Sequence, residues 1–147
     1  MSKLMTACAM ALFIATRTVN AKPMNRQEYN DLRGWQVPEN ENPADDGYLV
    51  VNNGVSERNV EGFDGYVSWL PKIAFDEQYK KYDTPIDRMQ IELDDLYDRM
   101  DKLGTFIAKG QPAFLNDDEW ALLQEQAHHM ANYYSVLNMR LDIAKSK

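Results

Sequence analysis

The sequence predicts an α+β protein in which a small antiparallel β-lobe with short helices is followed by a long C-terminal antiparallel helical hairpin. Short β-branched and aromatic runs, separated by glycine, proline and asparagine, fill the first half. Two apolar stripes at helical spacing fill the second half. The 147 residues suffice for one domain or a lobe with an appended hairpin. We therefore place the lobe at residues 1–83 and the hairpin at 84–147.

Three strands are expected in the lobe. The first covers residues 13–19, where β-branched and apolar side chains partly alternate with polar ones. The second covers residues 48–51 and is followed by Asn53 and Gly54, a pair that tolerates positive φ and favours a β-hairpin. The third covers residues 65–69 and places Tyr66 and Ser68 on one face.

Two short helices are expected between and after these strands. Asn25 can cap the first helix, Glu28 can complete the capping box, and Gly34 ends it after about Arg33. Residues 37–47 contain two prolines and several acids and predict a loop. The second helix begins at Pro71 and runs to about Lys80, with apolar contacts from Ile73, Phe75 and Tyr79.

The hairpin is predicted from two unbroken stripes whose steps alternate between three and four residues. The first helix, about 85–109, starts behind Thr84 and Pro85, and its stripe is Ile86, Met89, Leu93, Leu96, Met100, Leu103 and Ile107. The second, about 117–144, starts behind Asn116, and its stripe is Trp120, Leu123, Ala127, Met130, Tyr134, Leu137, Leu141 and Ala144. The short connection between them requires an antiparallel pair.

A further apolar row lies beside the stripe of the second helix and consists of Leu122, Tyr133, Val136 and Ile143. Two helices alone cannot bury both rows, so either the N-terminal lobe or a second copy of the chain must cover the extra one. We expect a homo-oligomer with this row as its interface.

Charge and cysteine content limit the classes of partner and compartment. The formal net charge of -7 argues against a DNA or RNA groove, because phosphate binding needs an excess of lysine and arginine. The single cysteine, Cys8, cannot form an internal disulfide, which favours the cytoplasm. The apolar stretch 4–15, followed by residues 19–21, also fits a signal peptide, although Arg17 interrupts it; the alternative is a buried segment. It is too short to span a membrane.

No residue pattern identifies a reaction, so we expect no enzyme, no catalytic residue, no metal and no cofactor. Glu125 and His128 have the Glu-x-x-His spacing of di-iron bundles, but the heptad pattern places both on the solvent side. His129 is expected at an interface or partly buried. The acids of the first hairpin helix have the pattern of surface ion pairs.

Aromatic and cationic residues concentrate in the lobe. Stacking faces beside guanidinium groups can hold a nucleotide or another small anion. The alternative is that Trp35, Trp69 and Tyr48 form the core of the lobe. The candidate ligand contacts are Arg26, Arg33, Trp35, Tyr66, Trp69 and Lys72.

Several segments resemble known families. AKPMNRQEYNDLRGW (21–35), DGYLVV (46–51) and GYVSWLPKIAFDEQY (65–79) resemble the N-terminal module of uncharacterised proteins of tailed phages and prophages. PIDRMQIELDDLYDRMDKLGTFI and the helix after it resemble a small helical-hairpin family named after an open reading frame of a crAss-like phage. More remotely, the lobe is similar to Thoeris anti-defence sponges and the hairpin to anti-CBASS sponges.

These resemblances imply a phage accessory protein in the host cytoplasm that counters immunity by binding and sequestering a small, cyclic-nucleotide-like signal. The long acidic loop at 38–46 and the fusion of lobe and hairpin depart from both sponge families, so their ligand contacts are not transferred. The alternative is an interaction module whose acidic hairpin docks onto a host or phage protein.

Overall fold

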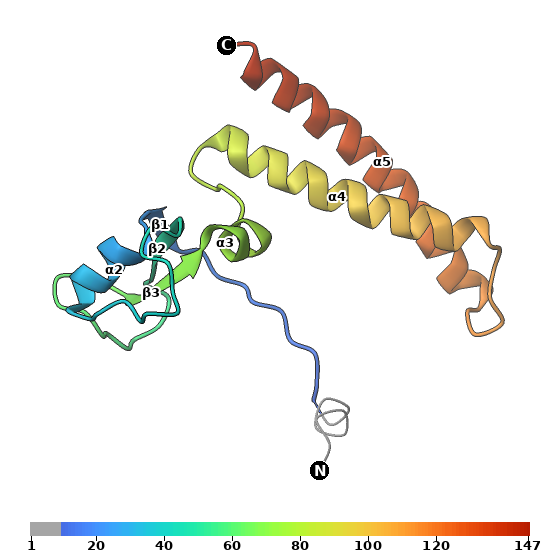
Figure 1. Ribbon diagram of the computed structural model, residues 1–147. Helices are drawn as coiled ribbons and strands as arrows, with labels where there is room; N and C mark the ends of the chain where they lie inside the picture. The colour runs from blue at the N-terminus through green and yellow to red at the C-terminus, as the bar shows by residue number, and fades with distance from the viewer. Residues whose placement is uncertain (1–9) are drawn as a thin grey trace. The chain divides into compact units, whose positions relative to one another are not determined.

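The computed structural model describes residues 10–147 and has the predicted α+β fold, with a three-stranded antiparallel sheet and two long C-terminal helices (Figure 1). The chain divides into two compact units, one ending at Tyr79 and the other covering Lys80–Lys147. Cys8 and the first part of the apolar stretch 4–15 lie outside the described residues.

The sheet consists of β1 (Asn20–Pro23), β2 (Gly47–Asn52) and β3 (Tyr66–Pro71), in the order β1-β2-β3. The strand expected at residues 13–19 is wrong, because residues 10–19 form no regular element and the side chains of Phe13 and Ile14 are each 88% exposed. The register explains the difference. Residues 20–23 already pair with residues 48–51 of β2, which leaves no partner strand for the residues before them.

The connection between β2 and β3 is longer than a tight hairpin. The side chain of Asn52 accepts from the backbone N–H of Gly54 at 3.1 Å, which forms the predicted turn, but the chain then continues to residue 65 before β3 begins. The Asn59 carboxamide bonds both the N–H and the C=O of Val67, at 2.8 and 2.7 Å. This side chain therefore holds the loop against the outer edge of β3.

Helix α2 (Arg26–Arg33) covers one face of the sheet. Tyr29 of α2 packs with Leu49 and Val67, and these three residues form the buried core of the lobe. The helix begins and ends as predicted: Asn25 and Glu28 form the capping box. Gly34 ends the helix with φ of 70°, a left-handed conformation that glycine adopts without strain.

Helix α3 (Lys72–Gln78) contacts the opposite pleat of the sheet through Phe75, whose ring stacks on Tyr48 at 3.9 Å and on Tyr79 at 5.0 Å. Ile73, expected among the apolar contacts, is instead 76% exposed. At 100° per residue, Phe75 and Tyr79 share one side of the helix, whereas Ile73 lies about 200° away. Because the seven-residue helix α3 packs on the sheet with the side that carries Phe75, the side that carries Ile73 faces solvent.

The hairpin consists of α4 (Pro85–Ala108) and α5 (Asp117–Lys145), packed antiparallel. Both helices start with a complete capping box, Thr84 with Asp87 and Asn116 with Glu119. Every residue of the two predicted stripes is buried or partly buried. The core lies where Leu93, Leu137 and Leu141 meet.

Candidate functional site

The outer face of α5 carries the additional apolar row that the sequence predicts. Its members remain exposed beside the α4–α5 seam, which confirms that two helices cannot bury both rows; they are Leu122, Tyr133, Val136 and Ile143. Met139 is exposed on the same helix and was not identified from the sequence. An uncovered face of this length on one helix is typical of a binding surface.

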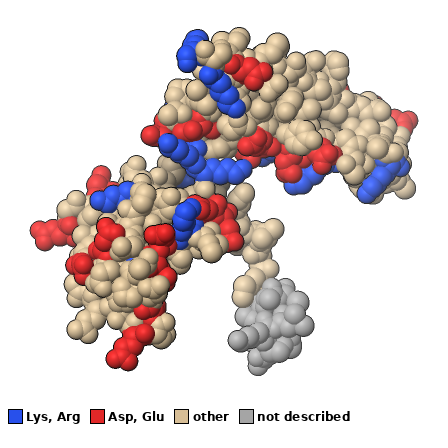
Figure 2. All heavy atoms as spheres, turned by 45° about the horizontal axis from the view of Figure 1, so that its top comes forward, with Lys and Arg blue, Asp and Glu red and all other residues tan. Residues whose placement is uncertain are grey.

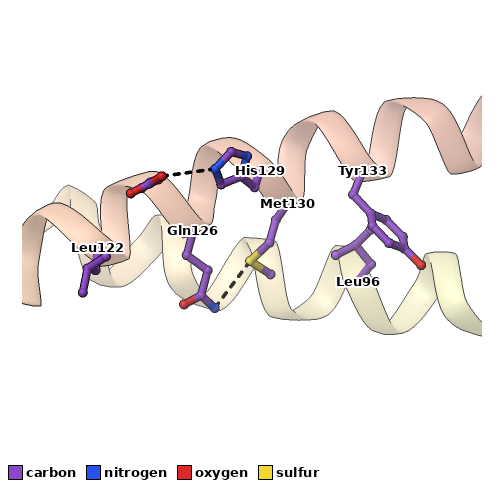
Figure 3. A pocket seen from close by; sticks show the side chains of 7 residues that line it. Leu96, Leu122, Gln126, His129, Met130 and Tyr133 are labelled. Atoms are coloured by element: carbon purple, nitrogen blue, oxygen red, sulfur yellow. Dashed lines mark hydrogen bonds and ion pairs between the residues drawn. The ribbon is translucent and has the colours of Figure 1, made fainter.

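A hollow of about 460 Å³ opens between α4 and α5 at one end of this row (Figure 3). Its lining residues are Leu96, Leu122, Glu125, Gln126, His129, Met130 and Tyr133. All but Leu96 come from α5, and two of them, Leu122 and Tyr133, also belong to the row. The hollow and the row are therefore parts of one continuous surface.

The floor of the hollow is apolar and its polar groups lie at the rim. Leu96, Leu122 and Met130 supply the apolar contacts. The Tyr133 hydroxyl donates to Glu92 of α4. Within the described residues, the one hydrogen bond of the Gln126 amide is to the Met130 sulfur, at 3.8 Å, a weak acceptor that the amide can exchange for a ligand. Such a lining fits a flat apolar or aromatic group with polar edges.

The three residues with potential metal or acid-base chemistry are exposed on α5, and two of them, Glu125 and His129, also line the hollow. Glu125 and His128 are exposed, as the heptad pattern predicts. Of the two environments expected for His129, the structure excludes partial burial within the chain, because its side chain is 69% exposed and contacts Glu125 at 3.4 Å; a position at an interface stays a prediction. His129 lines the hollow between α4 and α5 from α5. Among residues 10–147, no three His, Cys, Asp or Glu side chains cluster in a way that could hold a metal ion.

In the lobe, the structure brings Arg26 and Trp69 together. The guanidinium lies 4.5 Å from the Trp69 ring centroid. The same guanidinium contacts Glu41 at 2.8 Å and Asp45 at 3.7 Å, so it ties the acidic loop to α2. The Trp69 indole donates to the Met24 carbonyl at 2.7 Å and packs on the core of the lobe. For this residue the structure therefore agrees with the alternative of a core position.

A second pair forms where α2 ends. The Arg33 guanidinium lies 4.1 Å from the Trp35 ring centroid and donates to the Tyr29 hydroxyl at 2.8 Å. Trp35 is 52% exposed, so its ring is open to solvent rather than part of the core. This pair keeps both a stacking face and a cation available to a ligand.

The two remaining candidates lie elsewhere in the lobe. Tyr66 occupies the opposite pleat of β3 from Trp69, because the two residues are three positions apart. Lys72 is paired with Asp76 at 2.5 Å, and this hydrogen bond raises the pKa of the lysine. The six predicted contacts therefore form two arginine–tryptophan pairs and two separate residues.

Fold and surface together define a small α+β protein whose helical hairpin has an exposed, largely apolar face beside an open hollow. The family model named Sequestin matches residues 83–143, which span α4, the connection and most of α5. No curated protein and no solved structure matches the chain. Within the described residues, no helix has the length and apolar character needed to cross a membrane.

Proposed function

We propose that this chain binds and sequesters a small nucleotide signal, and that it acts as a phage accessory protein that blunts host immunity. The observation that carries the proposal is the match of residues 83–143 to the Sequestin model, whose name denotes sequestration. The matched segment contains the whole hollow between α4 and α5 and all four members of the exposed row.

The hollow is the first candidate site for this ligand. Its volume of about 460 Å³ falls in the range of small-molecule sites, which is about 300 to 1,000 Å³. A nucleobase would rest on Leu122 and Met130, while Gln126 and His129 would bond its polar edge. Both side chains reach the rim from α5.

Charge restricts the ligand that this surface accepts. Residues 83–143 contain twelve aspartates and glutamates but five lysines and arginines. A polyphosphate would be repelled, so the hairpin favours a nucleotide with few charges whose phosphates point away from Glu125. The Arg33–Trp35 pair of the lobe, which carries a cation, is the second candidate site.

Calorimetry against a panel of cyclic dinucleotides, cyclic trinucleotides and ADP-ribose derivatives tests the proposal. We expect one class to bind, and the double substitution Gln126→Ala with His129→Ala to weaken it by at least about tenfold. His128→Ala is the matched control, since it removes an exposed imidazole one residue away from the rim. Absence of heat with every member of the panel would contradict the proposal.

Sequestration also predicts that the ligand is returned unchanged. After the complex is heat-denatured, the released nucleotide should show the mass and chromatographic position of the input. Recovery of a cleaved or ring-opened product would instead identify an enzyme.

A second candidate function is protein docking through the acidic side of the hairpin. The exterior of α4 exposes Glu92, Asp94, Asp95, Asp98 and Asp101, and a surface of this charge would select a basic partner. Affinity capture with the wild-type chain and with an Asp94→Asn, Asp95→Asn variant separates the two functions. A partner lost by the variant, together with unchanged nucleotide binding, would favour docking.

A further inference from the structure

The outer face of α5 carries a stripe that is self-complementary when the helix direction is reversed. The stripe advances in steps of three and four residues and consists of Leu122, Glu125, His129, Tyr133, Val136, Arg140 and Ile143. Its centre falls between Asn132 and Tyr133. Counted outward from this centre, Leu122 is equivalent to Ile143, Glu125 to Arg140 and His129 to Val136.

From this symmetry we infer that a second copy of the chain packs antiparallel on the outer face of α5 as a two-fold homodimer. In an isologous interface each contact occurs twice, so Glu125 meets Arg140 of the partner subunit at two equivalent places. At both ends of the interface, Leu122 of one copy then packs on Ile143 of the other. Glu125 and Arg140 carry the opposite charges of the stripe, and this arrangement places each of them opposite the other.

The charge distribution supports a copy of the same chain as the occupant. Residues 126–139 contain no aspartate, glutamate, lysine or arginine, and loss of charge with enrichment of aromatic residues and methionine characterises interface cores. In Figure 2 the charged atoms of the hairpin gather along one long edge and at its ends, and a broad part of the surface between them is nearly free of charge. Packing through α5 also keeps the acids of α4 of the two copies apart.

Arg140 supplies a further argument. It is exposed, and among the ion pairs of residues 10–147 none involves it. In the same part of the chain, the one ion pair of Glu125 is with the neighbouring His129, at 3.4 Å. Each therefore has capacity for an ion pair with the other copy.

The dimer would also complete the hollow. With the same symmetry, Met139 of the partner subunit lies over Gln126, and Val136 of the partner subunit lies over His129. Arg140 of the partner subunit brings a positive charge beside Glu125, which lines the hollow. Enclosure of a nucleotide there rests on the proposed function, whereas the dimer does not.

Sedimentation velocity of the full chain without ligand tests the interface. The stripe is roughly 30 Å long and one helix wide, so we expect a small interface and a dissociation constant in the micromolar range. Glu125→Arg and Arg140→Glu should each weaken the dimer by roughly tenfold or more, because like charges then meet twice. The double variant should recover the wild-type constant.

Two further variants show whether a weakened dimer results from loss of the interface or from a general effect of charge or unfolding. Asp95→Arg makes the same charge change on the exterior of α4 and should leave dimerisation unchanged. Val136→Lys places a charge within the stripe and should give a monomer with unchanged helical circular dichroism. A wild-type monomer up to hundreds of micromolar, or a double variant as weak as the single ones, would overturn the inference. A dimer that binds no nucleotide would overturn the proposed function alone.

Discussion

At the scale of single residues, the buried leucines of the seam should determine the stability of the hairpin. Leu141 is 2% exposed and lies in the cluster formed with Leu93 and Leu137. Leu141→Ala should lower the free energy of unfolding by about 3 kcal/mol, because it removes buried methyl groups and leaves a cavity. Urea unfolding followed by helical circular dichroism measures the change.

Phe114 provides the control for this prediction. It is a large apolar residue of the connection between α4 and α5 and is 76% exposed. Phe114→Ala should change the free energy of unfolding by no more than about 0.5 kcal/mol. Equal effects of the two substitutions would show that the seam is not the core of the hairpin.

Gly47 is the residue of the lobe at which a side chain is least tolerated. A Cβ there would overlap the Trp69 ring and the Leu70 carbonyl oxygen, both fixed by strand pairing and core contacts. Gly47→Ala should therefore destabilise the lobe by about 2 kcal/mol or more. The thermal transition of the lobe measures it, and Gly54→Ala, where the closest contact is an Asn52 side-chain oxygen at 3.3 Å, should have a much smaller effect.

The sequence predicted the burial of single residues correctly where burial follows from the helical spacing of apolar side chains. All stripe residues of the hairpin are covered and all four members of the additional row are exposed. In the lobe, the pattern could not decide whether Trp69 binds a ligand or packs, since both roles use an aromatic residue near an arginine. Its contact with Met24, 45 residues away in the sequence, is not encoded in local spacing.

At the scale of elements, the N-terminal cap of α4 should make its stability depend on pH. The Asp87 carboxylate accepts from the backbone N–H of Thr84 at 3.0 Å, and this bond lowers the pKa of Asp87 below its ordinary value. A lowered folded pKa stabilises the helix above the unfolded value of about 3.9, and this contribution is lost as the pH falls through the folded pKa. NMR titration of the Asp87 carboxyl measures the shift.

Asp87→Asn serves as the control for the cap. It keeps the shape of the side chain but removes its titration, so the pH dependence of helix fraying below pH about 4 should diminish. Thr84→Ala should cost about 1 kcal/mol, because the N–H of Asp87 loses its acceptor. An Asp87 pKa at or above its ordinary value would contradict the proposed role of this bond.

The elements that the sequence predicts most accurately are those whose signals are local. Capping boxes at Asn25, Thr84 and Asn116 fix three helix starts within a few residues. Strand pairing depends on partners that are distant in the sequence, and residues 13–19 satisfied the strand pattern without having one. The hollow was missed for the same reason: Leu96, Gln126 and Met130 become one surface only when α4 and α5 are packed.

At the scale of the whole molecule, the division at residue 79 separates the Sequestin match from the Arg33–Trp35 pair. A ligand stabilises only the unit that contacts it, by about 2.7 kcal/mol at one hundred times the dissociation constant. Because the hairpin alone carries the match, we expect a bound nucleotide to raise the hairpin transition and leave the lobe transition unchanged.

Leu141→Ala and Gly47→Ala identify which transition belongs to which unit, since each substitution lies in the core of one of them. Differential scanning calorimetry of both variants with and without the nucleotide selected by the panel then locates the site. A shift confined to the lobe transition, abolished by Trp35→Ala, would transfer the site from the hollow to the arginine–tryptophan pair. Such a result would leave sequestration intact while removing the hairpin as the surface that performs it.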